Sequence, residues 1–247
     1  MLNFAADLAK KGGNLAYQHF TEAQKVSYKA DGSPVTPSDK AAETLIRKLI
    51  TKKYPEHGII GEEFEKVNPK AKYQWVIDPI DGTKDYIRGV PIWQTLVALL
   101  ENGKPIIGVA YFPVLKEIFT AERNKGTFLN GKRTKVSNVK ILKKAYLSHD
   151  SISHFEKINK SKNLLEITKT VQTKRGFGTF GLNLLLKGKI DIILNPHGAI
   201  HDFAAPSILV EEAGGKFSDF SGKNSINSGS AVCTNGYLHN EVVKLLN

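Results

Sequence analysis

Asp78-Pro79-Ile80-Asp81-Gly82-Thr83 is the stretch that decides the fold, and it directly follows the apolar run Tyr73-Gln74-Trp75-Val76-Ile77. The run predicts a strand, and the Pro-Ile pair after it predicts a turn that holds the backbone between two carboxylates. Mg²⁺ prefers oxygen ligands, so two aspartates and one peptide carbonyl can meet at one ion. Gly82 and Thr83 then open a predicted helical turn, whose first amides have no intrahelical partner and can bind an anion. The segment predicts a metal site beside a phosphate site.

Asp78 and Asp81 also fit a simpler role. Aspartate often caps turns in Asp-Pro and Asp-Gly sequences, and the two residues alone do not separate a capped turn from a metal site. Acidic residues brought close by the fold must decide between them.

Composition indicates a globular chain that forms one large domain or two fused lobes. The chain has 247 residues, of which 41% are hydrophobic. No apolar run reaches the roughly 20 residues of a membrane span, and Met1-Leu2-Asn3-Phe4 leads into an amphipathic segment instead of a signal peptide. A cytoplasmic location is therefore expected. The single cysteine, Cys233, lies in an apolar run and is predicted to be a core thiol instead of a nucleophile.

The net charge of +11, with a pI near 9.5, raises the question of nucleic-acid binding. The basic residues are spread over nearly the whole chain, and no basic strip is interleaved with aromatic residues. This distribution favours a solvated positive surface, which can also steer a small anionic substrate.

Hydrophobic periodicity predicts two helices in the first quarter of the chain. An amphipathic helix is expected over residues 2–20, weakened in the middle by Gly12-Gly13. A second helix is expected to begin after Thr36, with Pro37 in its first position and Asp39 in its third, and to end at about Lys53. Asp39 therefore has a capping role by sequence.

Strand patterns then dominate until about residue 140. A short buried strand over 58–61 ends in Glu62-Glu63, so acidic residues follow two successive strands. Three further strands separated by turn signals predict an antiparallel meander over 93–100, 105–112 and 118–121, with another turn at Asn130-Gly131. The remainder alternates and looks α/β, with strands over 145–148, 190–194 and 231–233 and helices over 178–187 and 202–213.

Three motifs in order resemble the inositol monophosphatase family of Mg²⁺-dependent, lithium-sensitive phosphatases. They are Gly61-Glu62-Glu63, Asp78 to Thr83, and His201-Asp202-Phe203-Ala204-Ala205 followed by Glu211-Glu212-Ala213-Gly214-Gly215. The resemblance covers nearly the whole chain, and residues 88–103 look most like the histidinol-phosphate phosphatase branch. It implies a mixed α+β and α/β fold, a layered αβαβα sandwich of the sugar-phosphatase type. We expect one domain over 1–247, with fused lobes at about 1–140 and 141–247.

The resemblance also implies a role for each matched residue. Glu62, Asp78 and the Ile80 carbonyl would hold one Mg²⁺. Asp78, Asp81 and Asp202 would hold a second, and Glu63 would help to bind a third through water. The amides of Gly82 and Thr83 would bind the phosphate. Thr83 and Asp39 would orient and deprotonate the attacking water.

Charge balance agrees with this assignment. Four converging carboxylates carry a charge of about −4, which stays ionised only if cations neutralise it. Two Mg²⁺ ions would balance that charge and promote an in-line displacement. Because the aspartates act as ligands, no covalent phosphoenzyme is needed.

Substrate choice depends on residues that differ from the family pattern. Inositol-specific relatives have a glutamate seven residues before the last metal aspartate, where this chain has Asn195. Histidinol phosphate carries a cationic amine, so an acidic contact is expected for it, yet neither Asn195 nor His197 supplies one. His201 stands where the family usually has tryptophan. The residues predicted to line the substrate pocket are Arg175, Phe180, Asn195 and His197.

The sequence thus predicts hydrolysis of a small phosphorylated metabolite, with L-histidinol phosphate favoured and inositol 1-phosphate or another sugar monophosphate as the alternative. A 3′-phosphoadenosine-5′-phosphate phosphatase and a non-catalytic metal-binding regulator are less favoured alternatives. The resemblance implies a homodimer, and no nucleic-acid or membrane partner is expected. The Lys-, Gly- and Ser-containing segment over about 25–35 is a candidate flap over the site.

Overall fold

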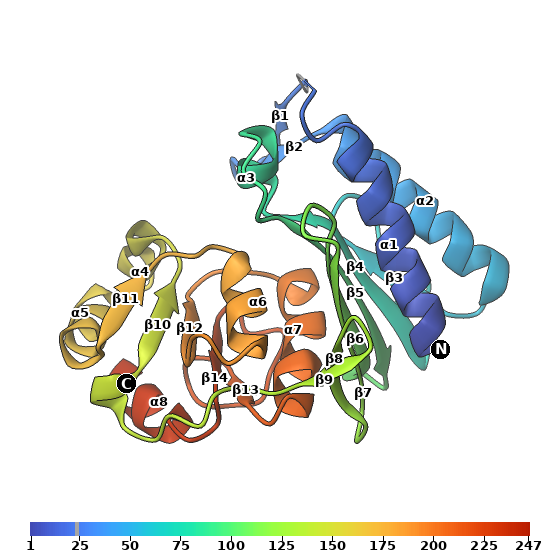
Figure 1. Cartoon of the computed structure of the whole chain (residues 1–247). Helices are drawn as coiled ribbons and strands as arrows, with labels where there is room; N and C mark the ends of the chain where they lie inside the picture. The colour runs from blue at the N-terminus through green and yellow to red at the C-terminus, as the bar shows by residue number, and fades with distance from the viewer. Residues whose placement is uncertain (23–24) are drawn as a thin grey trace.

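Two large sheets with helices on their faces make up the computed structural model, which describes residues 1–22 and 25–247 (Figure 1). The first sheet has the strand order β3-β4-β5-β6-β7-β8-β9, and only β3 and β4 are parallel in it. Its strands are β3 (Gly58–Gly61), β4 (Tyr73–Asp81), β5 (Gln94–Glu101), β6 (Lys104–Phe112), β7 (Glu117–Glu122), β8 (Gly126–Leu129) and β9 (Lys132–Thr134).

The second sheet has the order β11-β10-β12-β14-β13, with parallel pairs among its first three strands and antiparallel pairs in the rest. Its strands are β10 (Tyr146–His149), β11 (Thr173–Arg175), β12 (Ile192–Asn195), β13 (Lys216–Ser218) and β14 (Ala231–Thr234). A separate hairpin pairs β1 (Ser27–Tyr28) with β2 (Pro34–Val35).

Helices form the other three layers. They are α1 (Leu2–Gln18), α2 (Pro37–Lys53), α3 (Thr83–Ile87), α4 (Ile152–Lys157), α5 (Ser161–Thr170), α6 (Phe180–Leu186), α7 (Ile200–Glu212) and α8 (His239–Leu246), with a 3-10 turn over Leu142–Lys144. In Figure 1, α1 and α2 cover the outer face of the first sheet, and α6 and α7 lie between the two sheets. None of the helices in the described part of the chain is long and apolar enough to cross a bilayer.

Alternating side chains in the strands explain the layers. Trp75 and Ile77 of β4 pack with buried residues of α1 and α2 in one apolar cluster. Val76, between them, points to the opposite face and belongs to a second cluster with α6, α7 and one face of the second sheet. A third cluster joins the other face of the second sheet to α4, α5 and α8. The expected αβαβα sandwich is therefore confirmed, and the middle cluster joins both predicted lobes.

The glycine pair in α1 was predicted to weaken the middle of the helix, but the structure gives it a packing role. Gly12 and Gly13 are buried inside one continuous helix. A Cβ at Gly12 would lie 2.5 Å from Cδ1 of Ile46, and one at Gly13 would lie 2.8 Å from the Tyr111 ring. The pair therefore permits close packing of α1 on α2 and β6 and does not break the helix.

The strand at the decisive segment is also longer than predicted. Asp78 was expected at the end of a strand, but β4 continues through it to Asp81, so Pro79-Ile80 lies within the strand and does not form a turn. The two-residue turns at Asn102-Gly103 and Asn130-Gly131 are as predicted, with positive φ at all four residues.

Candidate active site

A β-bulge in β4 brings Asp78 and Asp81 to the same face of the strand. Asp78 pairs with Leu96 and Asp81 pairs with Gln94, so β4 has one residue more than β5 over this interval. Residues three apart normally point to opposite faces, and one extra residue reverses that relation. Thr95 Oγ1 donates to the Pro79 carbonyl over 2.8 Å, which holds the bulge in place.

Four carboxylates converge at this point from three elements. Ligand oxygens of Asp78, Asp81 and Asp202 lie within 4.8 Å of one another. Glu62 directly follows β3, and one of its carboxylate oxygens lies within 4.8 Å of one from Asp78. Asp202 is the third residue of α7, where its Oδ2 accepts a hydrogen bond of 2.5 Å from the Ala199 amide. The predicted metal-ligating carboxylates therefore do come together.

The electrostatics of the cluster fit a bound cation. Oδ1 of Asp78 is buried and has no hydrogen-bond partner among the described residues. Burial, and then the charges of Glu62, Asp81 and Asp202, raise the pKa of Asp78 well above its ordinary value. Burial followed by the Asp202 charge does the same for the pKa of Asp81. A divalent cation would remove this penalty, so these residues fit the metal that the resemblance implies.

Asp39 and Thr83 lie beside the carboxylates, as predicted. Asp39 is fully buried at the start of α2, and its Oδ2 accepts from the amide and the hydroxyl of Thr36, which completes the predicted capping box. Its other oxygen, Oδ1, lies 3.4 Å from Thr83 Oγ1, and that hydroxyl is 3.0 Å from the Ile80 carbonyl. Burial raises the pKa of Asp39, which strengthens its carboxylate as a base.

Gly82 precedes α3 in a left-handed conformation, with φ of 96°. This conformation suits glycine, and it places the first amides of α3 beside the cavity that Gly82 and Thr83 line. Gln94 fixes the neighbouring carboxylate, because its Nε2 donates to Asp81 Oδ2 over 2.7 Å.

Two further residues of α2 support the loop that carries Glu62 and Glu63. The buried Glu43 accepts from the Glu63 amide over 2.8 Å and from Arg47 Nε over 2.7 Å. Arg47 in turn donates to the carbonyls of Phe64 and Glu65. Neither residue was predicted, although both follow Asp39 at intervals of four along the same helix.

Lys29, in the loop between β1 and β2, contacts the acidic pair directly. Its Nζ lies 2.6 Å from Glu62 Oε1 and 2.8 Å from Glu63 Oε1. Burial raises the pKa of Glu63 to about 7, although Lys29 opposes that shift. The segment considered as a flap is thus a hairpin whose loop contacts predicted metal ligands; its mobility stays a prediction.

A cavity of about 340 Å³ adjoins the carboxylates and extends to the second sheet. The residues that line it beside the second sheet include Asn195 and His197, as predicted, and also Asp150 and His154, which were not. His154 Nδ1 lies 2.7 Å from Asp150 Oδ2, and the rings of His154 and His197 are 5.1 Å apart. No hydrogen bond reaches Asp150 Oδ1 from residues 1–22 or 25–247, so this oxygen can accept one from a ligand. Asp150 follows a predicted strand just as Glu62 does, which was the signal that could have identified it.

The other two predicted pocket residues lie elsewhere in the second lobe. Arg175 is exposed at the end of β11. Phe180 begins α6 and packs edge-on against Phe112, with ring centroids 6.2 Å apart. Cys233 is buried as predicted, and burial raises its pKa to about 12, so it is a poor nucleophile.

Comparison with known proteins gives a consistent match over the full length. The model of the inositol monophosphatase family matches residues 1–247. A histidinol-phosphatase of Mycobacterium tuberculosis is 37% identical over all of this chain and 97% of its own length, and one from Streptomyces coelicolor is 37% identical over 90% of this chain and 87% of its own. The solved structure of the Thermotoga maritima IMPase superimposes with a TM-score of 0.90 at 33% identity, covering 100% of this chain and 96% of that one.

Proposed function

Because the chain belongs to the inositol monophosphatase family, we propose that it is a Mg²⁺-dependent phosphomonoesterase that converts L-histidinol phosphate to L-histidinol and phosphate. The observation that carries the proposal is the meeting of Asp78, Asp81 and Asp202 within 4.8 Å, beside a cavity lined by Gly82 and Thr83. Carboxylates next to free amides suit a phosphate ester that is held by cations on one side and by backbone N–H groups on the other.

Different residues of the site would bind the metal, bind the phosphate and activate the water. Glu62, Asp78, Asp81, Asp202 and the Ile80 carbonyl would hold Mg²⁺, which when bound polarises the phosphoryl group and lowers the pKa of water. The amides of Gly82 and Thr83 would orient the phosphate. Thr83 would position the attacking water. The proton that this water loses would pass towards Asp39, whose Oδ1 is 3.4 Å from the threonine hydroxyl.

The residues that line the cavity beside the second sheet support histidinol phosphate as the substrate. The leaving group of histidinol phosphate carries an ammonium and an imidazole. Asp150 Oδ1 supplies an acidic contact for the ammonium, which Asn195 and His197 cannot supply. His154 holds the other oxygen of Asp150 and so orients the carboxylate. Relatives named histidinol-phosphatase at 35% to 37% identity support the same substrate.

Inositol 1-phosphate or another sugar monophosphate is the alternative substrate. Several relatives at 31% to 34% identity are named as inositol monophosphatases, among them one from Rhizobium meliloti. Asn195 in place of the glutamate that contacts sugar hydroxyls weighs against this alternative, because an amide is a weaker acceptor than a carboxylate.

Phosphate release from a substrate panel tests the proposal. The panel is L-histidinol phosphate, inositol 1-phosphate, fructose 1,6-bisphosphate and 3′-phosphoadenosine-5′-phosphate, each assayed with Mg²⁺ and with chelator. We expect the highest kcat/KM for histidinol phosphate and no turnover with chelator. A preference for another ester would overturn the substrate, and no hydrolysis of any ester would leave only a metal-binding regulator. The homodimer and the third ion at Glu63 stay predictions, which sedimentation and metal titration would check.

A further inference from the structure

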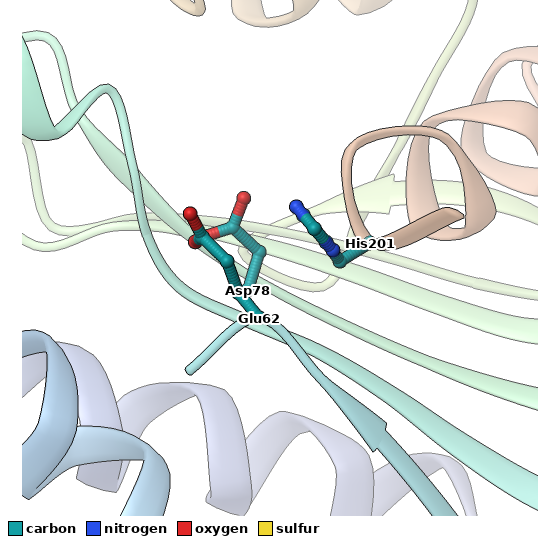
Figure 2. Close-up of side chains that lie close together, drawn as sticks. All are labelled: Glu62, Asp78 and His201. Atoms are coloured by element: carbon teal, nitrogen blue, oxygen red, sulfur yellow. The ribbon is translucent and has the colours of Figure 1, made fainter. Parts of the chain in front are cut away.

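His201 adds a nitrogen atom to a group of ligands that is otherwise made of oxygen atoms. It is the second residue of α7, directly before Asp202. One of its ring nitrogens lies within 4.8 Å of carboxylate oxygens of both Glu62 and Asp78. Figure 2 shows the imidazole on α7 facing these two carboxylates, which come from β4 and from the end of β3.

The imidazole is held in the cluster without a hydrogen bond. Its Nε2 lies 3.6 Å from Asp202 Oδ2, which is beyond hydrogen-bonding distance. In the described part of the chain, neither ring nitrogen of His201 has a hydrogen-bond partner, and the side chain is 19% exposed. Two ligands of one ion lie about 3 to 4 Å apart, because each metal–ligand bond is about 2.1 Å long. The upper limit of 4.8 Å around His201 is slightly longer than this spacing, so a bound cation would draw the three side chains closer together.

We propose that His201 is a direct nitrogen ligand of the cation held by Glu62 and Asp78, which rests on the proposed metal-dependent function. The imidazole then raises the affinity of this position for a first-row transition ion such as Mn²⁺ relative to its affinity for Mg²⁺. Imidazole is a good ligand for such ions, whereas Mg²⁺ favours oxygen. The position formed by Asp78, Asp81 and Asp202 has oxygen ligands only and suits Mg²⁺. The two neighbouring positions thus differ in metal preference.

Pulsed EPR of the full-length protein loaded with MnCl₂ tests this proposal without any substrate. We expect a ¹⁴N coupling from a directly bound imidazole, replaced by a ¹⁵N coupling when the protein contains ¹⁵N-histidine. The coupling should disappear in His201→Gln and remain in the matched control His197→Gln. Should His201→Gln fail to fold, His201→Trp provides the second variant, and the labelled wild type needs no variant.

Competition between Mn²⁺ and Mg²⁺ provides a second measurement. Loss of a ligand is expected to lower the ratio of Mn²⁺ to Mg²⁺ affinity by about tenfold or more in His201→Gln, measured by calorimetric titration. A wild-type spectrum without imidazole coupling, or an unchanged affinity ratio, would overturn the proposal. Either result concerns metal binding alone, so the proposed phosphatase activity is tested separately.

Discussion

Asp150 is the side chain on which the proposed choice of substrate depends most. In the proposed function, the metal-ligating residues act on the phosphoryl group, which all the candidate esters share. Asp150 lines the same cavity beside the second sheet, with its Oδ2 bonded to His154 Nδ1 and its Oδ1 available to a ligand. Discrimination between esters is therefore expected to depend on this part of the lining.

Asp150→Asn should weaken recognition of histidinol phosphate specifically. A hydrogen bond to a charged group contributes about 1.5–3 kcal/mol, so kcat/KM for this ester should fall by about 10- to 100-fold. For inositol 1-phosphate, kcat/KM should change by less than about threefold. Steady-state assays of phosphate release measure both values.

The matched control is Asp7→Asn, which makes the same substitution in an exposed pair with Lys11 on α1. Its kinetics should equal those of the wild type. An equal loss for both esters in Asp150→Asn would assign Asp150 a structural role and remove its part in specificity.

At the scale of elements, α2 both carries the proposed base, Asp39, and supports the loop of the proposed metal ligands Glu62 and Glu63. Asp39 lies in its first turn, and Glu43 and Arg47 follow on the same face, bonded to the segment after β3. Gly61 is required there, because a Cβ would lie 1.9 Å from Glu43 Oε1. The helix therefore holds the proposed base at a fixed distance from the proposed ligands Glu62 and Glu63.

Glu43→Gln should raise the Mg²⁺ concentration needed for half-maximal activity. The amide cannot accept from both Arg47 and the Glu63 backbone, so the acidic loop loses one anchor. Breaking a buried ion pair also lowers the free energy of unfolding, by about 3 kcal/mol. Activity against Mg²⁺ concentration and chemical denaturation measure the two effects.

Glu166→Gln is the control, since it removes an exposed ion pair with Lys169 on α5. Its free energy of unfolding should change by less than about 0.5 kcal/mol. An unchanged Mg²⁺ requirement in Glu43→Gln would contradict the anchoring role of Glu43.

The sequence predicted correctly those helix starts and turns that depend on only one or two residues. The Thr36-Pro37 start of α2 and the Asn-Gly turns of the first sheet were predicted because a side-chain cap or a positive φ is a property of one or two residues. The family motifs predicted that the carboxylates meet. The bulge at Pro79-Ile80 was not predicted, because a turn and a bulge differ only in how β5 pairs with the segment.

The second lobe was predicted less completely for a related reason. Helices α4, α5 and α8 were missed; each is short and buries only a few apolar side chains in the third cluster. Asp150 and His154 were missed because their place in the cavity depends on how the second sheet packs beside the first.

For the whole molecule, stability should depend on pH and on Mg²⁺ together. Burial raises the pKa of Glu63 to about 7, so its ionisation lowers the unfolding free energy of the metal-free protein as pH rises from about 4.5 to about 7. Asp78 and Asp81 act in the same direction. Burial lowers the pKa of His239 to about 4, so loss of its proton raises the unfolding free energy as pH rises from about 4 to about 6.5. The His239 ring hydrogen-bonds to Ser218 and Thr234 and to none of the four carboxylates.

Comparison with and without Mg²⁺ isolates the carboxylates, because His239 contributes equally to both samples. The increase in melting temperature on adding Mg²⁺ should grow as pH rises from 5 to 8, since ionised carboxylates bind the ion and protonated ones do not. Scanning calorimetry at several pH values measures it. An increase that is constant or shrinks over this range would contradict a metal site made of these residues.

The ligands of the proposed ions come from two different layers. Asp78 and Asp81 belong to the first sheet, whereas Asp202 belongs to α7 in the middle layer. An ion between them would act as a crosslink that closes the long loop of chain from residue 81 to residue 202, much as a disulfide does. Chelation should therefore loosen the start of α7 from the first sheet. Amide hydrogen exchange at the start of α7 should then become faster.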